Sequence, residues 1–188
     1  HVDSAFLHTP AIARVMGLAA LRLAEAELLP FRYAHYADRI ERWLTEREAQ
    51  ADAAGGALAV IDFAGARDAL GSFRRAVTAF DSAAAAALGE ADARTLADAN
   101  ERLPRVEASF LEPGGLRGRP WYRHVLNAPG SDTGYDALPL PELAEAIRAQ
   151  DAAGATAALT RIEAALRRAT DVLRVGNSPL RESEHLES

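Results

Sequence analysis

The chain has 188 residues, enough for one domain with a hydrophobic core, and carries a formal net charge of -6 at pH 7. All 21 basic residues are arginine and are mixed with acidic residues along the chain, which argues against a nucleic-acid-binding surface. The chain has no cysteine, which excludes disulfide bonds and thiol chemistry.

Two helices are predicted in the first third of the chain. The first begins near Pro10 and ends before Pro30, and because it is apolar on two faces we expect burial on more than one side. Its apolar residues include Ile12, Val15, Met16, Leu18, Leu21 and Leu23. The second runs from about Tyr33 to Ala54, with Ile40 and Leu44 inward and Arg47 outward, and Gly55 follows its end.

The clearest helical pattern lies between about Ala64 and Leu88, where apolar residues recur in steps of four and three. These residues are Ala66, Leu70, Phe73, Val77, Phe80, Ala84 and Ala87. The pattern predicts a seam for antiparallel bundle packing. A fourth helix is predicted from about Asp92 to Leu111, and Pro104 within it should kink it or split it in two.

A long loop, about residues 112–140, contains the one segment that helix packing does not explain, RPWYRHVLNAPGSDTGY. Pro and Gly set turns within it and aromatic side chains can anchor it, so we expect an ordered loop. A long connector between helix pairs is the alternative interpretation. The residues expected to structure the loop are Arg119, Trp121, Tyr122, Arg123 and His124.

A short helix from about Pro141 to Gln150 and a long one from about Asp151 to Val175 complete the pattern. The predicted fold is an all-α, up-and-down bundle over residues 1–175, with a flexible C-terminal tail at 176–188.

Catalytic and metal-binding patterns are missing from the sequence. No two of the five histidines are spaced to share a helix face, and no HExxH motif occurs. His124 beside Arg123 stands in a setting that could serve a site, but a ring that hydrogen-bonds the bundle is the simpler interpretation. We therefore predict no catalytic residue, metal ligand or cofactor in this chain.

The loop resembles the C-terminal helical domain of the glutamate carboxypeptidase and transferrin receptor family. The matching residues are Phe110, Pro113, Leu116, Arg119, Pro120, Trp121, Tyr122, Arg123, His124, Val125, Ala128 and Pro129. Leu29-Pro30-Phe31 and Tyr36-Ala37 extend the resemblance upstream.

The resemblance implies a homodimerisation domain that follows a zinc peptidase domain of the same polypeptide and lends a loop to its peptide-substrate pocket. The zinc would then belong to the catalytic domain, and this chain alone should hydrolyse no peptide. His8 matches a family histidine that is not a metal ligand, and His1 lacks the neighbouring residues of the ligand histidine.

Tyr135 matches the tyrosine that, in glutamate-specific members, binds the terminal glutamate of the substrate together with a preceding lysine. Here Gly134 replaces that lysine. A phenol donates one hydrogen bond to a carboxylate, and glycine supplies no cation, so glutamate preference is not implied. The alternative function is a non-catalytic interaction module of a receptor-like or stand-alone protein.

Overall fold

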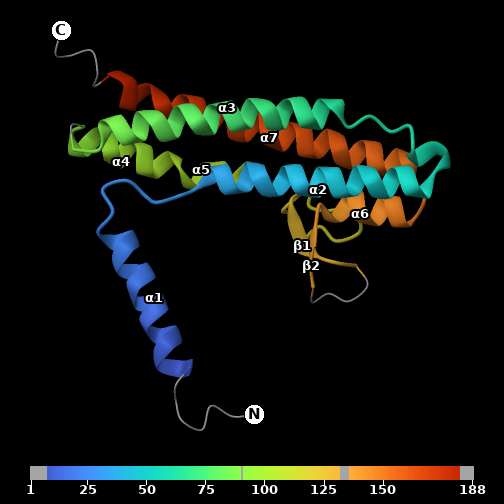
Figure 1. Ribbon diagram of the computed structural model, residues 1–188, viewed down its shortest axis with the longest axis horizontal. Helices are drawn as coiled ribbons and strands as arrows, with labels where there is room; N and C mark the ends of the chain where they lie inside the picture. The colour runs from blue at the N-terminus through green and yellow to red at the C-terminus, as the bar shows by residue number, and fades with distance from the viewer. Residues whose placement is uncertain (1–7, 90, 132–135, 183–188) are drawn as a thin grey trace.

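The computed structural model describes residues 8–89, 91–131 and 136–182, with backbone alone for 176–182. The helices are α1 (His8–Ala24), α2 (Tyr33–Ala54), α3 (Ala64–Ala87), α4 (Ala93–Arg102), α5 (Pro104–Ala108), α6 (Pro141–Arg148) and α7 (Ala152–Glu182), with a short 3-10 turn η1 (Gly56–Leu58). In Figure 1, α2, α3, α7 and the α4–α5 pair lie along the long axis, whereas α6 and a small hairpin lie beside α2. The predicted all-α bundle is confirmed.

Helix α3 provides the central apolar surface. Every residue of its predicted seam is buried, as are Ala69, Ala76 and Ala83 beside it. Its most extensive contacts are with α7, where Leu159, Ile162 and Leu166 are buried. Small alanine side chains at these positions let the helices approach each other closely.

Pro104 splits the predicted fourth helix into α4 and α5, as expected. It occupies the first turn of α5, where the amide that proline lacks would have no helical partner. Asp92 caps α4, because its Oδ1 accepts a hydrogen bond of 2.7 Å from the Thr95 amide.

Helix α1 differs from the prediction, because none of its residues is buried. It projects away from the bundle (Figure 1), so no element of the described part of the chain covers its apolar side chains. The predicted burial of α1 on more than one side is therefore not met by residues 8–89, 91–131 and 136–182.

Helix α7 also differs, since it continues to Glu182, past the predicted end at Val175. The predicted tail at 176–188 thus begins within a helix, and residues 183–188 lie outside the described part of the chain. Among the described residues, no helix is long and apolar enough to cross a membrane.

The pattern did not predict the two short strands in the long loop. β1 (Asn127–Pro129) and β2 (Ala137–Pro139) pair antiparallel, with Asn127 opposite Pro139 and Pro129 opposite Ala137. Leu140 follows with φ of 48°, in the left-handed region, and turns the chain from β2 into α6.

Candidate functional site

The loop between α5 and α6 contains a compact turn over residues 115–122, which is held by backbone hydrogen bonds. The Leu116 amide donates to the Tyr122 carbonyl at 2.7 Å, and the Arg119 amide donates to the Leu116 carbonyl at 3.0 Å. Gly115 has φ of 72°, and a Cβ there would lie 2.2 Å from the Pro120 carbonyl oxygen. Only glycine fits this position, so the turn depends on it.

Trp121 is not the buried anchor that its aromatic ring suggested. Its side chain is 71% exposed. The buried side chains that attach the loop are Phe110, Leu116, Val125, Leu126 and Ala128. Tyr122 is half-buried against them, and Arg123 is exposed, with its Nε donating to the Glu112 carbonyl at 2.9 Å.

His124 hydrogen-bonds the bundle. Its Nε2 lies 2.9 Å from Glu107 Oε1 on α5, and its Nδ1 accepts from the Leu126 amide at 3.2 Å. Nε2 is therefore the donor toward Glu107. The His124 ring also stacks on Phe110, with centroids 5.9 Å apart. The hydrogen bond from His124 lowers the pKa of Glu107, although burial acts in the opposite direction. This geometry matches the structural interpretation of His124.

Arg119 ties β1 to α6. Its Nη2 donates to both carboxylate oxygens of Glu145, at 2.7 and 2.8 Å, and its Nη1 donates to the Pro129 carbonyl. Glu145 Oε1 also accepts from the Ser131 amide at 3.0 Å, just beyond the end of β1. One buried guanidinium and one carboxylate thus hold the strand at two points.

Arg47 ties β2 to α2, and its predicted outward orientation is wrong. The residue is 8% exposed, its Nη2 donates to the Pro139 carbonyl at 2.9 Å, and its Nη1 donates to Gln50 at 2.7 Å. Burial lowers the pKa of the Arg47 guanidinium. Arg47 follows Ile40 and Leu44 at helical spacing, a signal that could have placed it on the inner face.

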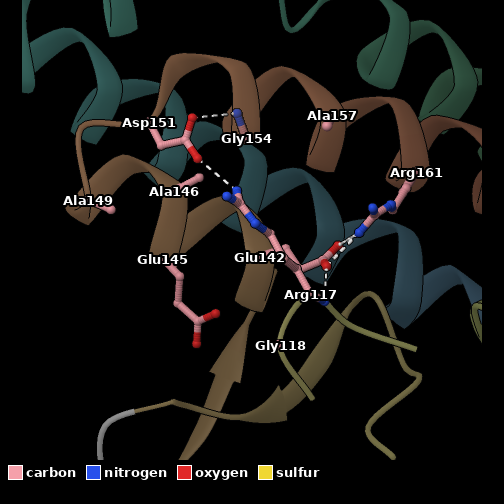
Figure 2. Close-up of a pocket in the computed structure, with 10 residues that line it drawn as sticks. All are labelled: Arg117, Gly118, Glu142, Glu145, Ala146, Ala149, Asp151, Gly154, Ala157 and Arg161. Atoms are coloured by element: carbon pink, nitrogen blue, oxygen red, sulfur yellow. Dashed lines mark hydrogen bonds and ion pairs between the residues drawn. The ribbon is translucent and has the colours of Figure 1, made fainter. Parts of the chain in front are cut away.

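A cavity of about 380 Å³, lined by charged side chains and by alanine and glycine, lies between the start of the loop and helices α6 and α7. Figure 2 shows two ion pairs in it, Arg117–Asp151 at 2.7 Å and Arg161–Glu142 at 2.5 Å. Asp151 also caps α7 by accepting from the Gly154 amide at 2.8 Å. In Figure 2 the Glu145 side chain points away from these pairs, toward the strands. The cavity's charged groups thus fasten the loop to the bundle.

Tyr135 and Gly134, the residues assigned to substrate recognition by resemblance, lie outside the described residues. Both strands that flank them are described, and the two buried arginines fix those strands. Across the described ranges, no group of three His, Asp or Glu residues could hold a metal ion.

A family model, the transferrin receptor-like dimerisation domain, matches residues 61–174. The chain belongs to this family. The matched region of this dimerisation domain begins just before α3, contains the whole loop and hairpin, and ends within α7. Helices α1 and α2, including Arg47, precede it.

The dimerisation domain is similar to parts of larger curated proteins. It is 32% identical over 148 residues to "Probable glutamate carboxypeptidase VP8" of Zea mays, and the match covers 78% of this chain and 20% of that protein. It is 28% identical over 145 residues to "Probable glutamate carboxypeptidase LAMP1" of Arabidopsis thaliana, over 77% of this chain and 20% of that protein. The "Inactive zinc metalloprotease C354.09c" of Schizosaccharomyces pombe is 35% identical over 75 residues, which are 40% of this chain and 9% of that protein.

The chain thus spans about a fifth of the length of the first two relatives. It is the dimerisation domain of a glutamate-carboxypeptidase-like protein.

Proposed function

We propose that this domain joins two subunits of a glutamate-carboxypeptidase-like zinc exopeptidase and completes its substrate pocket with the tip of the β1–β2 hairpin. The zinc centre then belongs to a peptidase domain of the same polypeptide, and this chain contributes no catalytic residue. Peptide substrate would meet this domain at Tyr135.

The observation that carries the proposal is the attachment of the hairpin at both strands. Arg119 donates to the last carbonyl of β1, and Arg47 donates to the last carbonyl of β2. Each strand has three residues, and so short a pair is marginal on its own. Burying a charged side chain costs free energy, and a loop that only connects two helices has no need of one. A loop that presents a side chain to a site does need a fixed base.

The chemistry of the tip supports an exopeptidase that tolerates several terminal residues. The Tyr135 hydroxyl can donate one hydrogen bond to a substrate carboxylate. Gly134 adds no positive charge, so a second, charge-assisted contact from this position is missing. We expect weaker preference for a terminal glutamate than a lysine at position 134 would give.

The exposed apolar side chains of helix α1 support a homodimer, or another protein surface that covers them. The large apolar residues of α1 are each at least 50% exposed, whereas a helix of a soluble domain commonly packs its apolar face against the core. A partner surface on the second subunit would cover part of it.

The proposed function is tested by steady-state kinetics of the full-length protein with Tyr135→Phe. Loss of a hydrogen bond to a charged group should raise KM by roughly ten- to a hundredfold with kcat little changed. The Tm should stay near that of the unmodified protein, since only a hydroxyl is removed. A lower Tm with unchanged kinetics would identify Tyr135 as a packing residue of a connector.

A non-catalytic interaction module is the second candidate, favoured by the similarity to the inactive zinc metalloprotease of Schizosaccharomyces pombe. The two candidates share the dimerisation role and differ in the peptidase domain. Zinc-ligand residues in the polypeptide upstream of His1, or their substitution, would separate them directly.

A further inference from the structure

We propose that a second cavity, between α2, α5 and the loop that leads into β1, binds a free α-amino acid with an aromatic side chain. Its volume is about 370 Å³, and the residues that the argument uses are Tyr36, Arg39 and Trp43 of α2, Glu107 of α5, and His124 and Leu126 of the loop. Small-molecule sites usually have volumes of roughly 300–1,000 Å³, so the cavity suits a small ligand.

Two opposite charges line this cavity without contacting each other. Arg39 is exposed and forms no hydrogen bond or ion pair with any residue in the described ranges. The Glu107 carboxylate contacts His124 and Tyr36 instead. In the cavity of Figure 2, by contrast, both arginines pair with a carboxylate. A cation and an anion that line one cavity unpaired suit a ligand that carries both charges.

Glu107 is held as an anion and keeps room for a further donor. The His124 ring lies 2.9 Å from its Oε1, and this hydrogen bond lowers the pKa of Glu107. A carboxylate has about four lone-pair sites, of which His124 and Tyr36 use two. The Glu107 side chain is 46% exposed, so a ligand ammonium can reach it.

Aromatic rings provide the apolar wall of the cavity. Tyr36, Arg39 and Trp43 are three and four positions apart and therefore share one face of α2. Tyr36 stacks on Phe110, with centroids 6.0 Å apart, whereas Trp43 is half-buried and has no ring partner among the described residues. Leu126 adds a buried apolar surface. A ligand ring beside Trp43 would gain the edge or stacking contacts that aromatic pairs favour.

A free amino acid fits these groups better than a ligand with one charge. An anion alone would be attracted by Arg39 and repelled by Glu107, and a cation alone would be repelled by Arg39. In a free amino acid, the ammonium and the carboxylate are attached to one carbon, so each can meet its opposite charge while the side chain lies against the rings. An amide bond at either group would remove one of the two charges.

The first test compares ligands on the full-length protein by isothermal titration calorimetry. The probes are L-phenylalanine, 3-phenylpropanoate, which lacks the ammonium, and 2-phenylethylamine, which lacks the carboxylate. We expect L-phenylalanine to bind at least about fivefold more tightly than either analogue, because each analogue loses a charge-assisted hydrogen bond. No binding of L-phenylalanine, or equal binding of either analogue, would overturn the proposal.

The second test locates the bound carboxylate. Arg39→Met removes the guanidinium, and Arg42→Met is the matched control, because Arg42 is exposed on the same helix and does not line the cavity. Arg39→Met should weaken L-phenylalanine binding about fivefold and leave 2-phenylethylamine binding unchanged, since that probe has no carboxylate. The control should match the unmodified protein. Equal weakening of both probes, or unchanged L-phenylalanine binding, would overturn the assignment of Arg39.

Amide hydrogen exchange of the same protein distinguishes this cavity from a site in another domain. Saturating L-phenylalanine should slow exchange in peptides covering residues 33–47 and 122–129 and leave those of α3 unchanged. Protection confined to the peptidase domain would overturn the proposal. Binding of Gly-Gly-Phe without binding of L-phenylalanine would assign the cavity to a peptide terminus and would also overturn it. These outcomes do not depend on Tyr135, so this proposal and the proposed function can fail separately.

Discussion

Arg119 and Glu145 form a two-hydrogen-bond ion pair between the loop and α6, with side chains 8% and 21% exposed. The Glu145 carboxylate also accepts a hydrogen bond from the Ser131 amide. The pair is thus the link between the bundle and the strand that leads to the hairpin tip.

Glu145→Gln should destabilise the domain substantially. It leaves the Arg119 guanidinium buried without an opposite charge, which costs about 3 kcal/mol when a pair is mostly out of water. Urea denaturation measures the loss of unfolding free energy. The control is Glu101→Gln in the exposed pair with Arg105, where a change within about 0.5 kcal/mol is expected. Equal effects of the two substitutions would contradict the role of the buried pair.

Trp121→Ala should cost little stability in this domain, because the indole is 71% exposed. We expect a change within about 1 kcal/mol by thermal or urea unfolding. Phe110→Ala is the contrast, since that ring is fully buried and its loss should cost roughly 3–5 kcal/mol. A large loss of unfolding free energy for Trp121→Ala would mean that the indole packs against other side chains in solution.

The helical part of the fold could be predicted because its signals are local. The α3 seam is a repeat within one helix, and Pro104 breaks its helix by its own geometry. The hairpin could not be predicted in this way, since strands of three residues are too short for a period-two pattern. Contacts from Arg47 and Arg119 define it instead.

The candidate site was predicted only in part. Arg119 was expected to structure the loop, but its partner Glu145 lies on another helix, which sequence spacing does not reveal. Arg47 was assigned to solvent because a charged helix residue is usually exposed, although Ile40 and Leu44 precede it on the same face. Trp121 was expected to anchor the loop because it is aromatic, but its side chain is 71% exposed.

Acid should selectively weaken the contact between Glu107 and His124. The pKa of Glu107 is lower in the folded state than its ordinary value of 4.5, chiefly because of the hydrogen bond with His124. The ionised carboxylate therefore contributes stability above the ordinary pKa, and this stability is lost as the pH falls through the folded pKa. The difference in unfolding free energy between the unmodified chain and Glu107→Gln should shrink as the pH falls from about 7 to about 3. A difference that stays constant over this range would contradict the assignment.

The chain should form a dimer in solution, and apolar residues of α1 should contribute to it. Light scattering at high micromolar concentration should give twice the chain mass, and Leu18→Asp should shift the equilibrium toward monomer. Val60→Asp is the control, because Val60 is exposed and apolar but lies outside α1. Monomer alone in the unmodified chain would contradict the expectation.

Ligand-dependent amide hydrogen exchange of the full-length protein tests most directly whether the hairpin tip completes a substrate pocket. The ligand is a non-hydrolysable peptide analogue with a free terminal carboxylate, and the observed peptides cover residues 127–139. We predict that the analogue slows exchange there, and that Tyr135→Phe reduces this protection at the same analogue concentration. Protection confined to the peptidase domain, with the hairpin unchanged under saturating analogue, would contradict the proposed function.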